Sequence, residues 1–76
     1  MVEKTVLLSN FGKLKNFVAE MNTLDFDVSA VSGGKTVNAK TIEELFALDL
    51  TRPITVIADT TAVGAFTKIV KPFEID

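Results

Sequence analysis

The 76-residue chain contains no histidine, cysteine, tryptophan or tyrosine. Without imidazole and thiolate groups it cannot form a Cys/His zinc site, a Ser-His-Asp triad, a disulfide or a phosphohistidine. No pair of carboxylates stands at catalytic spacing in a recognisable motif. We therefore predict that the chain is not an enzyme and that it uses neither a metal nor a cofactor.

Basic residues are also few. Eight Lys and Arg residues against ten Asp and Glu residues give a net charge of −2 and an isoelectric point near 5.0. Nucleic-acid binders usually carry a basic face and an isoelectric point above about 9, and the aromatic platform that binds single strands is missing when phenylalanine is the only aromatic residue. We expect no nucleic-acid partner.

Long hydrophobic runs are absent as well. The apolar run that opens the chain ends at Leu8, too early for a signal peptide or a membrane span, so we expect a cytoplasmic protein without membrane insertion. The length and the globular composition, 47% hydrophobic and 24% charged residues, predict one domain over residues 1–76. A mean hydropathy of +0.34 favours an exposed apolar patch and leaves self-association open.

A helix is predicted to begin at Phe11, because apolar residues then recur at three- and four-residue spacing and form one face. This apolar face consists of Phe11, Leu14, Phe17, Val18 and Met21. Either Ser9 or Asn10 is expected to cap its first turn.

The remaining elements follow from alternation, turns and caps. Strands are predicted at residues 4–8, 26–30, 35–40 and 54–58, with a hairpin turn at Gly33 and Gly34. A short helix is predicted over residues 41–46, opened by a capping box of Thr41 and Glu44 and carrying the apolar face Ile42, Leu45 and Phe46. A last helix is predicted to begin at residue 62 and to be stopped by Pro72. The order β-α-β-β-α-β-α indicates an α+β fold, an antiparallel sheet covered on one face by helices.

One segment resembles a known family. The run Gly34-Lys35-Thr36-Val37-Asn38-Ala39-Lys40-Thr41-Ile42 is similar to the Gly-Lys-Ser/Thr-Val-Asn-x-Lys-Ser-Ile run of HPr, the small phosphocarrier of the bacterial sugar phosphotransferase system. The resemblance continues more weakly along the whole chain. It implies an HPr-like open-faced β-sandwich, with a four-stranded antiparallel sheet and three helices on one face.

The resemblance fails where HPr carries its phosphate. Members of the family use a histidine in a His-x-Arg-Pro stretch at the start of the first helix, where this chain has the shorter stretch Ser9-Asn10-Phe11-Gly12-Lys13. A phosphoester on Ser9 would be too inert for rapid relay, since the nucleophile decides this chemistry. The resemblance therefore implies a binding or regulatory relative that is not competent for histidine phosphotransfer. Its partners would be enzyme I-like or sugar-specific components of that system.

Three sets of residues are candidate sites. Ser9, Asn10, Lys13 and Lys15 form a candidate anion site at a helix N-terminus; the alternatives are helix capping and a solvated face. Thr41 falls on the serine that a dedicated kinase phosphorylates in many HPr proteins, the alternative being a helix cap. The resemblance implies that Glu43, Glu44 and Phe46 lie on the surface by which HPr docks its partners, with acidic residues in place of the family's Met-Gly pair.

Two other functions stay open beside the binding relative. The first is a switch controlled by an HPr-type kinase through Thr41, in which phosphate adds charge at a helix N-terminus. The second is a small interaction module with an unrelated partner.

Overall fold

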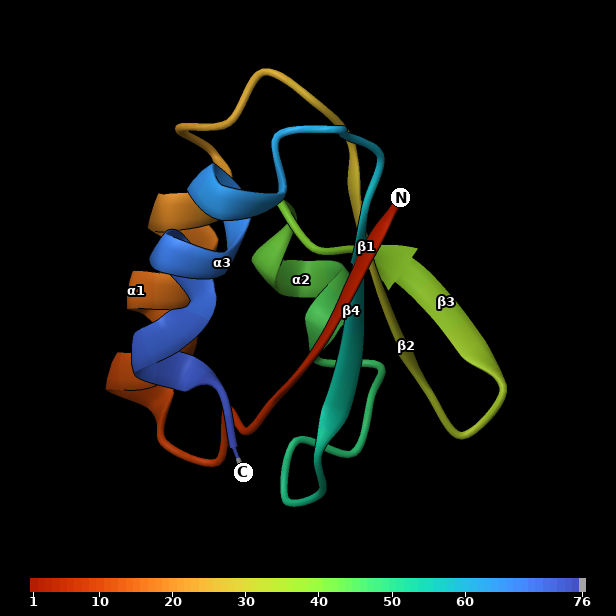
Figure 1. Ribbon diagram of the computed structural model, residues 1–76. Coiled ribbons are helices and arrows are strands. Elements are labelled where there is room, and N and C mark those ends of the chain that lie inside the picture. Colours follow the sequence, from red (N-terminus) through yellow and green to blue (C-terminus); the bar gives the residue numbers. More distant parts are fainter. Residues whose placement is uncertain (76) are drawn as a thin grey trace.

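The computed structural model describes residues 1–75. Within them one antiparallel sheet has the strand order β1-β4-β2-β3, and three α-helices cover one of its faces (Figure 1). The strands are β1 (Val2–Val6), β2 (Val28–Ser32), β3 (Lys35–Asn38) and β4 (Ile54–Ala58). The helices are α1 (Phe11–Met21), α2 (Ile42–Leu45) and α3 (Val63–Val70), followed by a 3-10 turn, η1 (Lys71–Phe73). The predicted open-faced sandwich is confirmed.

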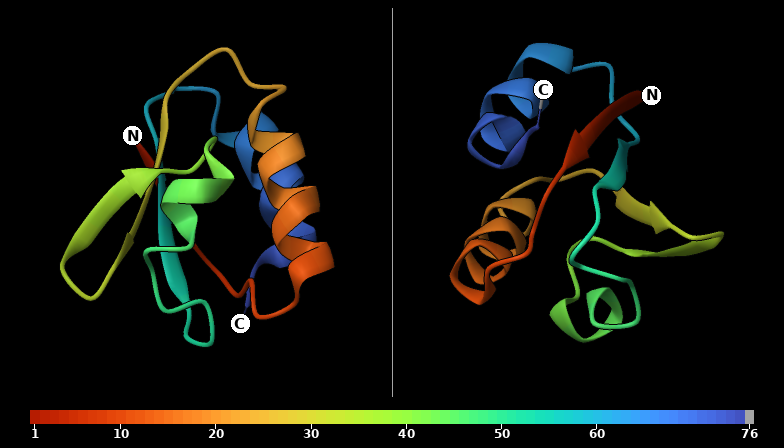
Figure 2. Two further views of the ribbon diagram at one scale, coloured as in Figure 1. Left: turned by 180° about the vertical axis from the view of Figure 1, so that it is seen from behind. Right: turned by 90° about the horizontal axis from the view of Figure 1, so that it is seen from below.

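The central strand β4 agrees with its prediction at both ends. Ile54, Val56 and Ala58 are fully buried against the helices, while Thr55 and Ile57 point to the other face and are half-buried. This period of two follows from the pleat of the strand. The right-hand view of Figure 2, from below, shows the helices of residues 1–75 on one side of the sheet only, so this second face has no helix over it.

The predicted hairpin between β2 and β3 is also confirmed. Gly33 and Gly34 both have positive φ, 57° and 81°, and connect the paired residues Ser32 and Lys35. Two successive positive φ values are typical of a two-residue turn that matches the twist of its strands. Without a Cβ, glycine adopts these values at little cost.

The return strand β3 ends two residues earlier than predicted. The Asn38 side chain accepts a hydrogen bond from the Lys40 N–H at 2.9 Å, and the Asn38 carbonyl accepts one from the Thr41 N–H at 3.2 Å. Asparagine side chains that bond to the backbone two residues on produce turns. The strand therefore ends at Asn38, although the alternation continues to Ala39, which is buried.

The first strand begins and ends two residues before its predicted bounds. Its outer edge is paired with the C-terminal segment, residues 73–75: Leu7 donates its N–H to the Phe73 carbonyl at 3.0 Å, and Ile75 donates its N–H to the Thr5 carbonyl at 3.1 Å. An edge strand covered in this way presents fewer unpaired groups to another chain.

The helices pack their predicted apolar stripes on the sheet. Leu14, Phe17 and Met21 of α1 are buried, and so are Phe66 and Val70 of α3. α3 begins one residue later than predicted, and Pro72 lies inside η1. No helix within residues 1–75 is long and apolar enough to cross a membrane.

Candidate functional site

Two exposed phenylalanine rings form a pair where the start of α1 meets the end of α2. Phe11 is 60% exposed and Phe46 is 54% exposed. Their ring planes are parallel within 3° and their centroids are 6.3 Å apart. The Lys15 ammonium lies 5.9 Å from the Phe11 centroid, within the range of a cation–π contact. We call Phe11, Phe46 and Lys15 the aromatic patch.

The prediction that Phe11 contributes to the core is wrong, and so is the placement of Phe46 on the buried face of α2. Phe11, the first residue of α1, stacks on Phe46 at the surface, and the apolar stripe of α1 is buried only from Leu14 onward. On α2, Leu45 is buried and Ile42 packs against the core. The aromatic patch therefore places Phe11, which the sequence assigned to the core, next to Phe46, a candidate residue for partner binding.

The predicted cap at the start of α1 is confirmed for Asn10. Its Oδ1 accepts hydrogen bonds from the N–H groups of Gly12 at 2.7 Å and Lys13 at 3.3 Å. Two of the first-turn donors on which an anion site would depend are therefore already satisfied. Ser9 and Lys13 are exposed, and Lys15 lies over the Phe11 ring. The anion site remains a prediction.

The capping box predicted at Thr41 and Glu44 is not formed. Thr41 occupies the N-cap position, but its side chain makes no capping hydrogen bond. Glu44 Oε1 instead accepts a hydrogen bond from the N–H of Asn38 at 3.3 Å. Among residues 1–75, β3 is an edge strand, so the outward N–H of Asn38 has no strand to bond and the Glu44 carboxylate bonds to it in place of the helix cap.

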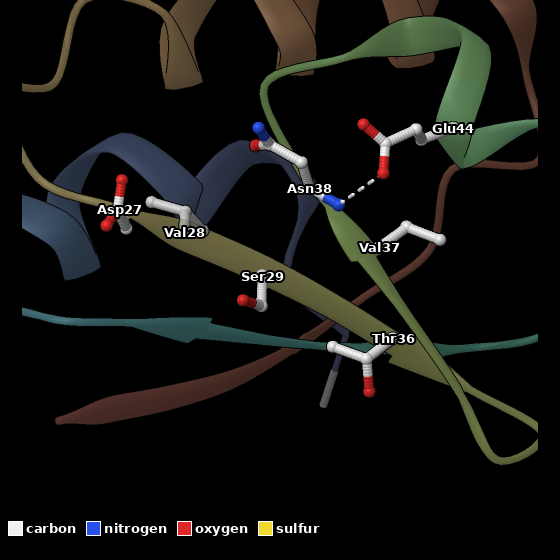
Figure 3. A pocket seen from close by; sticks show the side chains of 7 residues that line it. All are labelled: Asp27, Val28, Ser29, Thr36, Val37, Asn38 and Glu44. Carbon is white, nitrogen blue, oxygen red and sulfur yellow. Dashed lines mark hydrogen bonds between the residues drawn. The ribbon is translucent and has the colours of Figure 1, made fainter.

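This contact of Glu44 places it in a hollow of about 300 Å³ at the β2–β3 edge (Figure 3). The hollow is lined by Asp27, Val28, Ser29, Thr36, Val37, Asn38 and Glu44. Of these residues, only Glu44 is a candidate site residue from the sequence. The other polar residues were missed because the hollow forms only when β2, β3 and α2 come together. Glu43 is exposed on the first turn of α2.

A second contact holds the far end of α2 to the hairpin, because the Lys35 ammonium donates to the Ala47 carbonyl at 3.5 Å. The chain then enters a loop where Asp49 accepts hydrogen bonds from the Thr51 hydroxyl at 2.6 Å and the Thr51 N–H at 3.1 Å. Arg52 lies 3.4 Å from the same carboxylate. These contacts, the Thr51 hydroxyl first, lower the pKa of Asp49 from its ordinary value of 3.8.

The Asp49 loop predicts a pH dependence of stability. Because the folded state lowers the pKa of Asp49, the ionised carboxylate is stabilising above its unfolded pKa, and this contribution is lost as the pH falls through the lowered folded value. We expect wild type to be more stable than Asp49→Ala at neutral pH and the difference to shrink once the pH is below 3.8. Urea unfolding at a series of pH values measures it. A difference that stays constant from about pH 7 to about pH 3 would contradict the argument.

Comparison with known proteins supports the fold and adds no family assignment. No protein-family model matches the chain, and no curated protein sequence matches it. The crystal structure of HPr-C-His from Thermoanaerobacter tengcongensis is similar, with a TM-score of 0.79 and 18% sequence identity, over 95% of this chain and 89% of that chain. The chain therefore has an HPr-like fold.

Proposed function

We propose that this chain, as a single HPr-like domain over residues 1–76, is a cytoplasmic binding or regulatory relative of the bacterial sugar phosphotransferase system that does not carry phosphate on histidine. Two observations together support this proposal: the chain has an HPr-like fold, and it contains no histidine at any position. At the start of α1, Asn10 caps the helix. Without the phosphoacceptor histidine, binding to partner proteins is the part of an HPr-like role that this chain can still perform.

The aromatic patch supports a binding role. Phe11 and Phe46 expose apolar rings from two different elements at one place on the surface. Aromatic residues are enriched at protein interfaces and often dominate their energetics. The exposed Glu43 and Glu44 on the adjoining helix disfavour a partner with an acidic surface at this position. The partners that we propose are enzyme I-like or sugar-specific components.

Incubation with enzyme I and phosphoenolpyruvate tests the proposal. We expect intact-mass spectrometry to find no added phosphate on this chain, while an HPr with its histidine, in a matched reaction, gains one phosphate. We also expect an excess of this chain to slow phosphate transfer to that HPr, because both proteins would occupy the same partner. Stable incorporation of phosphate would overturn the non-carrier part, and an unchanged transfer rate would overturn the binding part.

A second function, a switch phosphorylated on Thr41, has one observation in its favour. The Thr41 side chain makes no capping hydrogen bond, and Glu44, its expected capping partner, is bonded to Asn38. Phosphate on Thr41 would add about −1.5 to −2 charges beside the first turn of α2. Treatment with ATP and an HPr-type kinase, followed by mapping of the phosphate by mass spectrometry, tests this function. An unmodified Thr41 would exclude it.

A further inference from the structure

A groove runs between α1 and the α3–η1 segment, on the helical layer and away from the aromatic patch. Its volume is about 470 Å³, and it is lined by Asn16, Glu20, Lys68, Ile69, Pro72 and Phe73. Pockets that bind small molecules usually measure about 300 to 1,000 Å³. The right-hand view of Figure 2 shows α1 next to both α3 and α2, so the groove and the patch lie on different sides of α1.

Helical geometry separates the two surfaces. Asn16 follows Phe11 by five residues, and Glu20 follows Lys15 by five residues. At 3.6 residues per turn, a step of five residues turns by about 140° around the helix axis. A ligand in the groove would therefore leave the aromatic patch accessible.

The apolar floor of the groove is part of the fixed core. Phe73 is buried and packs edge to face on Phe17, with the ring centroids 5.4 Å apart and the planes at 85°. Ile69 is half-buried against the same core, and the exposed Pro72, with its ring-fixed φ, belongs to the turn η1. A ligand would meet this floor without first having to order it, which lowers the cost of binding.

The rim of the groove carries opposite charges on its two walls. Asn16 and Glu20 lie one turn apart on the same face of α1, and Lys68 lies on α3. All three residues are exposed. The ion pairs formed within residues 1–75 are Lys4 with Glu74 and Arg52 with Asp49, so neither Glu20 nor Lys68 is paired there.

From this arrangement we infer that the groove binds a small zwitterion with an apolar body, of the class of free aliphatic α-amino acids. Lys68 would attract the ligand carboxylate, and Glu20, with the Asn16 amide oxygen, would accept hydrogen bonds from its ammonium group. The aliphatic side chain would cover Ile69 and Pro72. A ligand with one charge would leave the opposite wall without a partner, so the pair of walls favours the zwitterion.

Titration of the ¹⁵N-labelled chain with L-leucine and two analogues tests the inference. The analogues are 4-methylpentanoate, which lacks the ammonium group, and isopentylamine, which lacks the carboxylate. We expect leucine to shift amide resonances of α1 and α3 saturably and to leave those of α2 in place. Each analogue should bind about threefold to fivefold more weakly, the size expected for one exposed charge contact.

Substitutions on the rim assign each charge. Lys68→Gln should weaken the binding of leucine and 4-methylpentanoate by about threefold to fivefold and leave isopentylamine unaffected. Glu20→Gln should show the reverse. Lys35→Gln, which removes an exposed lysine of β3 outside the groove, is the matched control and should change none of the affinities. Since these side chains are exposed, the spectra of the variants should stay those of the folded chain.

Three outcomes would overturn the inference. The first is the absence of any saturable shift up to about 10 mM leucine, which would mean a dissociation constant above about 10 mM. The second is equal affinity for leucine and an analogue, which would show that only one wall takes part. The third is a set of α1 and α3 shifts that depend on protein concentration without ligand, which would mean that a second copy covers the groove.

Discussion

Phe17→Ala should remove most of the chain's folding stability. Phe17 is completely buried in α1 and packs edge to face on Phe73 at 5.4 Å. Truncating a buried phenylalanine to alanine costs about 3 to 5 kcal/mol, since it removes apolar contacts and leaves a cavity. A domain of this size has a total stability near the lower end of the usual 5 to 15 kcal/mol. Urea unfolding followed by circular dichroism measures the loss.

Phe11→Ala is the matched control, because it makes the same change on the same helix. Phe11 is 60% exposed and contacts Phe46 and Lys15 at the surface, so its truncation removes an exposed pair and creates no cavity. We expect the free energy of unfolding to fall by about 1 kcal/mol or less. Equal losses for the two variants would mean that both rings belong to the core, as the helical spacing alone predicts.

This contrast shows where the sequence was sufficient for the fold and where it was not. β4 and the glycine turn were predicted correctly because the determinants lie within a few residues: alternating β-branched side chains, and glycines that accept positive φ. The spacing of α1 predicted its face. It did not predict that Phe11 is exposed, because the ring stacks on Phe46, which belongs to another element.

The bounds of β1 show a related limit. The residues that follow this strand are as apolar as the strand itself, so composition does not determine where pairing stops. Pairing stops at Val6, whose partner Ile54 is the first residue of β4. A contact between segments so far apart leaves no local pattern in either segment.

The candidate site was predicted only in part for similar reasons. Asn10 caps α1 as expected, because a cap needs only the residue and the helix that follows it. The capping box failed because Glu44 had a competing donor, the Asn38 N–H on the edge strand. The groove below Lys68 and Glu20 lies between α1 and α3, two helices that are separated in the sequence by three of the four strands. The spacing of residues along one helix therefore does not reveal it.

Phe46→Ala should produce the second large effect, a loss of partner binding without a loss of fold. If an enzyme I-like partner docks on the aromatic patch, as we propose, the two rings become the buried aromatic centre of the interface. Truncating such a residue typically costs at least about 2 kcal/mol, or roughly a thirtyfold weaker affinity. Calorimetric titration of the partner with wild type, Phe46→Ala and Phe11→Ala measures the change, and thermal unfolding confirms that each variant is folded.

Val63→Ala supplies the control for this experiment, because Val63 is also a large apolar side chain with 52% exposure but lies at the start of α3. We expect its affinity for the partner to equal that of wild type. Because the planes of Phe11 and Phe46 are parallel and the rings are 6.3 Å apart, removing one should change the position of the other. The double variant should therefore lose less than the sum of the two single losses. Equal weakening by Val63→Ala would show that the partner responds to exposed apolar area in general, and the aromatic patch would then have no separate role in docking.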